Sequence, residues 1–163
     1  MESYIPFFQY ALIGIGATLI MDLWALTLRR AFGVPSLDFA LVGRWVLHMR
    51  HGIWFHNPIT AAPYQQGERP LGWLLHYAIG VIFAAAFGIF AGTTWIMQPT
   101  PTPPIIFGLL TVGFPFLIMQ PAFGAGIATA PTPSPGKARV KSLMTHLVFG
   151  VGLWLSAMAL AQF

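Results

Sequence analysis

Long apolar segments make up most of the chain, and charged residues separate them at only a few places. No Asp, Glu, Lys or Arg occurs from position 70 to position 136. One continuous helix of that length would extend about 100 Å, whereas the hydrocarbon core of a bilayer is about 30 Å thick. The chain must therefore turn back, and the prolines of segment 98–104 (QPTPTPP) predict where it does so. The pattern predicts membrane-spanning helices over residues 5–28, 71–97, 105–130 and 142–162.

The predicted fold is an all-α polytopic membrane protein, with these four spans in a single membrane domain over residues 1–163. A shorter amphipathic segment, residues 36–51, lies in the loop between the first two spans. Ser36 favours a helix start and Gly52 favours a stop. We therefore expect a short helix in this loop that lies at the membrane interface.

Composition supports a membrane protein and excludes other classes. Hydrophobic residues are 56% of the chain and charged residues 7%, whereas a soluble domain has about 25% charged residues. The aromatic content of 15% excludes a disordered chain, and a net charge of +4 divided between separate loops argues against nucleic-acid binding. The absence of Cys excludes thiol oxidoreductase chemistry and covalently attached c-type haem. The expected partner is the lipid bilayer.

Positive charges set the expected orientation. The first loop, residues 29–70, carries all the Arg residues but one, and the third loop carries Lys137, Arg139 and Lys141. The proline-rich second loop carries no charge. Cytoplasmic loops are enriched in Lys and Arg, so the first and third loops are predicted to be cytoplasmic and both termini outside.

A short internal repeat relates the two halves of the chain. The sequence LIMD at 19–22 corresponds to LIMQ at 117–120, and the pattern His-x-x-x-Gly-Val occurs at 76–81 and again at 146–151. We interpret the halves as two similar helical hairpins related by an axis along the membrane normal. The repeat places the polar residues Asp22, His76, Gln120 and His146 in one layer.

Small residues recur every four positions beside these polar residues, which indicates close helix packing. In the first span the stripe is Tyr10, Gly14, Thr18 and Asp22, and in the second it is His76, Gly80, Ala84, Gly88 and Gly92. The polar side chains are therefore expected to point into the bundle. In the third span, Pro115, Pro121 and the glycines that follow predict a helix that is kinked or unwound past Gln120.

An ionisable residue inside a span usually has a partner or a function. We therefore predict a pocket open to the cytoplasm, lined by Asp22, His76, Gln120 and His146, with Arg29, Arg44, Glu68 and Arg69 at its mouth. The preferred function is to bind and move a small polar or ionic solute, with Asp22 or a His carrying a proton or cation. This function needs no cofactor, and so small a transporter is expected to form a homodimer.

Four alternatives use some of the same residues. His76, His146 and Asp22 match a 2-His-1-carboxylate metal site, and the two His could instead ligate haem in a redox protein or enzyme. The Arg residues of the first loop with Asp22 and a His could act on lipid headgroups. A purely structural role, as an assembly partner in a membrane complex, would need only helix-to-helix hydrogen bonds. His48, His51 and His56 are expected to be solvated loop residues, and no motif assigns catalytic residues.

Several stretches resemble a known family. They are GATLIMDLWALTLRRAFGVPSLDFALVGRW, GERPLGWLLHYAIG, MQPAFGAGIATAPTPSP and SLMTHLVFG, and together they extend over most of the chain. They resemble a bacterial four-span membrane family known only as a domain of unknown function. The resemblance implies a protein of the bacterial inner (plasma) membrane. It implies no activity, cofactor or site residues.

Overall fold

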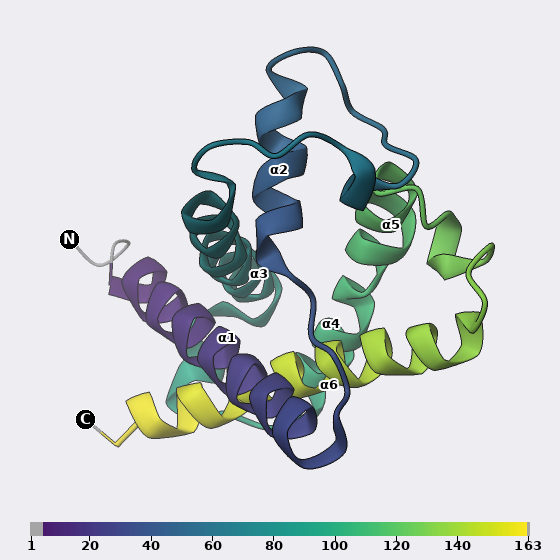
Figure 1. Cartoon of the computed structure of the whole chain (residues 1–163). Helices are drawn as coiled ribbons and strands as arrows, with labels where there is room; N and C mark the ends of the chain where they lie inside the picture. The colour runs from purple at the N-terminus through teal and green to yellow at the C-terminus, as the bar shows by residue number, and fades with distance from the viewer. Residues whose placement is uncertain (1–4, 163) are drawn as a thin grey trace. The chain divides into compact units, whose positions relative to one another are not determined.

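The computed structural model describes residues 5–162, and all regular secondary structure in that range is helical (Figure 1). The longer helices are α1 (Ile5–Phe32), α2 (Phe39–Met49), α3 (Glu68–Met97), α4 (Thr102–Thr111) and α6 (Pro135–Leu160). Shorter elements are the 3-10 turns η1 (Ile59–Ala61) and η3 (Ile127–Thr129), the π-helix η2 (Pro115–Met119) and the single turn α5 (Gln120–Ala122).

Four helical segments are long and apolar enough to cross a membrane, which confirms the all-α membrane fold class. They are Phe7–Phe32, Glu68–Met97, Thr102–Ala122 and Pro135–Leu160. The third span ends at Ala122 and not near position 130, because Pro121 and the glycines after it end the helix. The fourth begins at Pro135, earlier than position 142, since a proline fits the first turn of a helix.

The chain forms two compact units, each assembled from separate segments. Unit 1 combines the segment that ends at Ser36, the segment Tyr77–Thr111 and the segment from Met144 onward. Unit 2 combines Leu37–His76 with Val112–Leu143. Helices α3 and α6 thus contribute their N-terminal parts to unit 2 and their C-terminal parts to unit 1.

In unit 1, α1 packs against α3 through the predicted stripe of small residues. A Cβ added at Gly14 would lie 2.8 Å from the carbonyl oxygen of Gly80, and one added at Gly80 would overlap with the Thr18 hydroxyl. Further along, the ring of Tyr10 covers Gly88. The two backbones meet because these positions lack bulky side chains, so the predicted packing of this stripe is confirmed.

The stripe ends at Gly92, where α3 is broken. Gly92 has φ 70° and ψ −177°, a conformation outside the helical region that glycine adopts readily. Its carbonyl accepts a hydrogen bond from the Tyr10 hydroxyl at 2.7 Å, which satisfies a group that the break exposes. The prediction that Gly88 and Gly92 together mediate close helix packing is therefore wrong at Gly92, which has no close neighbour within 4 Å on its Cβ side.

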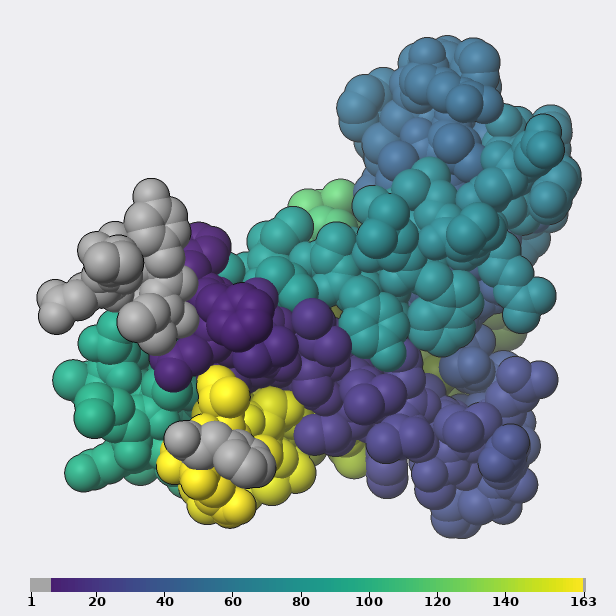
Figure 2. Space-filling view, turned by 90° about the vertical axis from the view of Figure 1, so that its left-hand side faces the viewer, coloured from purple at the N-terminus to yellow at the C-terminus, as the bar shows by residue number. Residues whose placement is uncertain are grey.

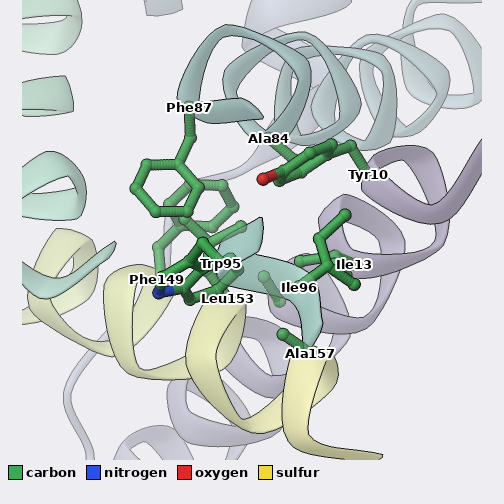
Figure 3. Packing of buried hydrophobic residues seen from close by; sticks show 10 residues of the cluster. Tyr10, Ile13, Ala84, Phe87, Trp95, Ile96, Phe149, Leu153 and Ala157 are labelled. Atoms are coloured by element: carbon green, nitrogen blue, oxygen red, sulfur yellow. The ribbon is translucent and has the colours of Figure 1, made fainter. Parts of the chain in front are cut away.

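The other contacts in unit 1 also involve glycines. A Cβ at Gly108 of α4 would lie 2.6 Å from the Cα of Gly150 on α6, and one at Gly152 would lie 2.8 Å from the Cα of Ala17 on α1. Figure 3 shows the buried core between these helices, with the ring of Phe87 beside Trp95 at a centroid distance of 4.8 Å. The equivalence of the two predicted hairpins remains a prediction.

In unit 2, α2 crosses the start of α3 at a pair of glycines. A Cβ at Gly43 would overlap with the backbone of Glu68, and one at Gly72 would overlap with the carbonyl of Phe39. The predicted loop helix is confirmed, but its N-cap is Asp38 and not Ser36. The Asp38 side chain accepts a hydrogen bond from the Ala40 N–H at 3.0 Å, which leaves Ser36 outside the helix.

The third span breaks where its prolines predict. Pro115 has no N–H to donate, and the following turn widens to a π-helix in which the Gln120 N–H bonds to the Pro115 carbonyl. Past Ala122 the backbone is irregular. The carbonyls of Ala122 and Phe123 accept from the N–H groups of His56 and Ile59 at 2.8 and 3.0 Å. The first loop therefore satisfies backbone groups that the broken helix leaves without partners.

We predict that Gly43→Ala destabilises the protein by about 3 kcal/mol, because the added methyl group overlaps with backbone atoms that cannot rotate away. Thermal and denaturant unfolding in detergent measure the change. The control is Gly136→Ala on α6, where nothing lies within 4 Å of the added Cβ. It should be neutral or slightly stabilising. Equal effects of the two substitutions would contradict the α2–α3 contact.

Candidate functional site

Asp22 lies on the face of α1 that packs against α3, one turn beyond Thr18. It is half-buried, and the hydroxyl of Tyr77 donates a hydrogen bond to its Oδ2 at 3.0 Å. The prediction that Asp22 lies on the packed face of α1 is confirmed. The sequence analysis did not select Tyr77 as a site residue. Its pairing with Asp22 depends on the contact between α1 and α3, and no residue near Tyr77 in the sequence indicates that pairing.

His146 is held by a hydroxyl from another helix of unit 1. The Thr111 hydroxyl donates to the carbonyl of Gly108 at 2.6 Å and lies 2.8 Å from Nδ1 of His146. When Thr111 donates its one hydroxyl proton to the Gly108 carbonyl, it accepts a hydrogen bond from Nδ1–H of His146. In that tautomer, Nε2 of His146 carries a lone pair and can accept a proton or bind a cation.

The other predicted pocket residues, His76 and Gln120, belong to unit 2. The buried ring of His76 stacks on Phe39 at a centroid distance of 3.9 Å and meets the edge of Trp73 at 5.8 Å. Gln120 is 9% exposed, and its Nε2 lies 3.5 Å from the hydroxyl of Ser142, at the limit of a hydrogen bond. Within residues 5–162, its Oε1 is buried with no hydrogen-bond partner.

The predicted pocket residues are divided between the units: Asp22 and His146 belong to unit 1, whereas His76 and Gln120 belong to unit 2. The pocket that combines all of them remains a prediction. In the part of the chain that the structure describes, no three His, Cys, Asp or Glu side chains are grouped to hold a metal ion. The metal and haem interpretations of His76, His146 and Asp22 gain no support from this geometry.

Two of the predicted mouth residues, the half-buried Arg44 and the buried Glu68, form an ion pair in unit 2. The guanidinium of Arg44 donates to both carboxylate oxygens of Glu68, at 2.8 and 2.7 Å. Arg44 also donates to the carbonyl of Ala62 at 3.1 Å, and Glu68 accepts from the N–H of Gln65 at 3.0 Å. The hydrogen bond to Glu68 raises the pKa of Arg44. The pair joins α2 to the first residue of α3, while Arg29 and Arg69 are exposed.

Two His residues of the first loop are not solvated as predicted. His48 is 5% exposed, and its Nε2 donates to the carbonyl of Pro63 at 3.1 Å. Its ring contacts that of His56 edge to face, with centroids 5.0 Å apart. Burial, together with the nearby His48 and Arg44, lowers the pKa of His56. The prediction is wrong for both because the loop folds back over α2, whereas His51 is exposed as expected.

The helices define a membrane protein with four candidate spans. The chain belongs to the family described as "Protein of unknown function (DUF2938)", which it matches over residues 11–160. This confirms the family resemblance seen in the sequence. No curated protein and no solved structure matches the chain.

We predict that Glu68→Gln lowers the free energy of unfolding by about 2 kcal/mol, because the half-buried Arg44 loses its anionic partner. Denaturant titration in detergent measures the loss. The neighbouring Arg69→Gln is the control, since Arg69 is exposed and its loss should change stability by less than about 0.5 kcal/mol. If the two variants have the same free energy of unfolding, the ion pair does not stabilise the contact between α2 and the start of α3.

The lowered pKa of His56 predicts a loss of stability in acid. The unfolded chain binds this proton with a pKa of about 6.5, more tightly than the folded chain does. The folded chain therefore has its full stability from neutral His56 above about pH 6.5. This stability declines as the pH falls from there toward the lower pKa that His56 has in the folded chain. Unfolding midpoints at about pH 7.5 and about pH 5 should differ less in His56→Gln than in the wild type. The exposed His51→Gln should behave like the wild type.

Proposed function

We propose that this protein binds a small polar or ionic solute within the membrane and moves it across, with Asp22 and His146 as the groups that carry a proton or cation. The observation that carries this proposal is their shared setting in unit 1. Each is a titratable side chain on a membrane-length helix, and each is positioned by a hydroxyl group from a different helix. Ionisable residues in such helices commonly mark solute and proton pathways.

Energetics favour this function over a structural one. An Asp in the centre of a spanning helix costs about 2.5–3.5 kcal/mol, whereas a hydrogen bond between spanning helices returns about 0.6 kcal/mol on average. The bond from Tyr77 to Asp22 thus offsets part of the cost, and Asp22 lies about 15 Å from the last residue of α1. Helix packing alone would not require a carboxylate here.

The break in the third span supports the same proposal. Discontinuous helices form the binding sites of many secondary transporters, since their unwound backbone supplies polar groups at membrane depth. Here a π-helix leads directly to the buried Gln120, whose Oε1 lacks a hydrogen-bond partner among the described residues. A solute, proton donor or water molecule that bonds to this oxygen would relieve the cost of burying it.

The location and orientation belong to this proposal too. The family resemblance supports a bacterial inner membrane. The distribution of Lys and Arg supports an orientation in which residues 29–70 and the first turns of α6, which carry Lys137, Arg139 and Lys141, face the cytoplasm. Both termini would then lie outside. A homodimer is proposed because four spans make a small transporter.

The test is solute-driven proton movement in vesicles. Protein reconstituted into vesicles that contain a pH-sensitive dye is exposed to steps of sodium, potassium, magnesium, manganese or choline chloride. We expect at least one cation to change the internal pH faster than in protein-free vesicles. Asp22→Asn and His146→Gln should abolish this change, because neither variant side chain can exchange the proton.

Matched control variants distinguish the loss of proton exchange from a loss of folding. Asp38→Asn removes a carboxylate outside the spans and keeps a good N-cap, and His51→Gln removes an exposed imidazole. Both should transport like the wild type. Unchanged transport in Asp22→Asn, or no response to any cation in the wild type, would contradict the proposal.

A further inference from the structure

The first loop presents three consecutive apolar side chains at the surface of unit 2. Ile53, Trp54 and Phe55, here called the loop wedge, are 44%, 54% and 74% exposed. They lie between α2 and α3, outside the candidate membrane spans. This loop is coloured blue to teal in Figure 2, where it forms part of the visible surface. Exposed apolar side chains that are adjacent in sequence indicate a surface with a partner.

Hydrogen bonds hold the backbone of the loop wedge on both sides. The N–H of Ile53 donates to the carbonyl of His48 at 3.2 Å, and the indole of Trp45 donates to the carbonyl of Trp54 at 2.8 Å. Directly after the wedge, the N–H of His56 donates to the carbonyl of Ala122 at 2.8 Å. This fixed backbone holds the three side chains in exposed positions outside the core cluster of unit 2.

Charge around the loop wedge indicates which partner covers it. Arg50 and His51 precede it and are exposed, and no Asp or Glu occurs between Asp38 and Glu68. Aromatic rings next to cationic groups suit the headgroup region of a bilayer, where Trp and Tyr concentrate and anionic lipids attract Arg. A second copy of the same positive surface would instead be repelled across a symmetric contact.

We propose that the loop wedge inserts into the headgroup region of a bilayer that contains anionic lipid, and so anchors unit 2 to the lipid surface. Phe55 and Trp54 supply the buried apolar area, and Arg50 supplies the attraction to lipid phosphate. The anchor is independent of the transport proposed above, since it uses none of the residues assigned to the solute.

The chain contains no Cys, so a single introduced cysteine can be labelled without background. The test uses Phe55→Cys carrying a nitroxide spin label, in the full chain reconstituted into phosphatidylcholine vesicles with and without phosphatidylglycerol. Phe55 is highly exposed, so folding should survive the change. The matched control is Thr60→Cys, an exposed polar position in the same loop. Collisions with oxygen report contact with lipid, and collisions with a nickel chelate report contact with water.

We expect the ratio of oxygen to nickel accessibility to be several-fold higher at position 55 than at position 60. Phosphatidylglycerol should raise the ratio at position 55, and Arg50→Gln should reduce that increase. Equal ratios at the two positions would overturn the proposal. Dipolar broadening between labels at position 55 that disappears on dilution with unlabelled protein would also overturn it, because the partner would then be a second copy. Indifference to phosphatidylglycerol would overturn the role of anionic lipid.

Discussion

Close backbone contact at glycines is the constraint on which the rest of the structure depends. Inside a membrane, apolar side chains contact lipid tails as favourably as they contact another helix, so the hydrophobic effect does not drive helices together. Helices associate instead through close van der Waals packing, which small residues allow. Three of these contacts have a polar pair within about two turns of the helix. The Gly14–Gly80 contact lets Tyr77 reach Asp22, and the Gly108–Gly150 contact lets Thr111 reach His146. The Gly43–Gly72 region does the same for Arg44 and Glu68.

Backbone hydrogen bonding imposes the second constraint, since a bilayer offers no water to unpaired groups. Helix α3 breaks at Gly92, where a side chain from α1 satisfies the carbonyl. The third span ends at Ala122, where the first loop supplies the missing donors. The first loop is thus part of the packed structure of unit 2. Its ion pair, its His residues and its exposed apolar wedge all follow from that attachment.

Much of the fold could be predicted from the sequence because its signals are local. Apolar segment length predicted the spans, proline positions predicted the break in the third span, and four-residue spacing predicted the faces on which Asp22 and Gly80 lie. The predictions that failed depend on contacts between distant segments. Gly92 was expected to continue a helix contact, and His48 was expected to be solvated, because neither the break at Gly92 nor the folding of the loop over α2 has a local signature.

The sequence by itself determined the class of protein, the number of spans and the residues that carry titratable groups, because hydrophobicity, helix length and side-chain chemistry are properties of single segments. The tertiary structure alone decided which hydroxyl holds each group. It places the Tyr77 hydroxyl beside the carboxylate of Asp22 and the Thr111 hydroxyl beside Nδ1 of His146. Such pairings depend on where two helices cross, and helix crossing is set by packing between segments that are far apart in the chain.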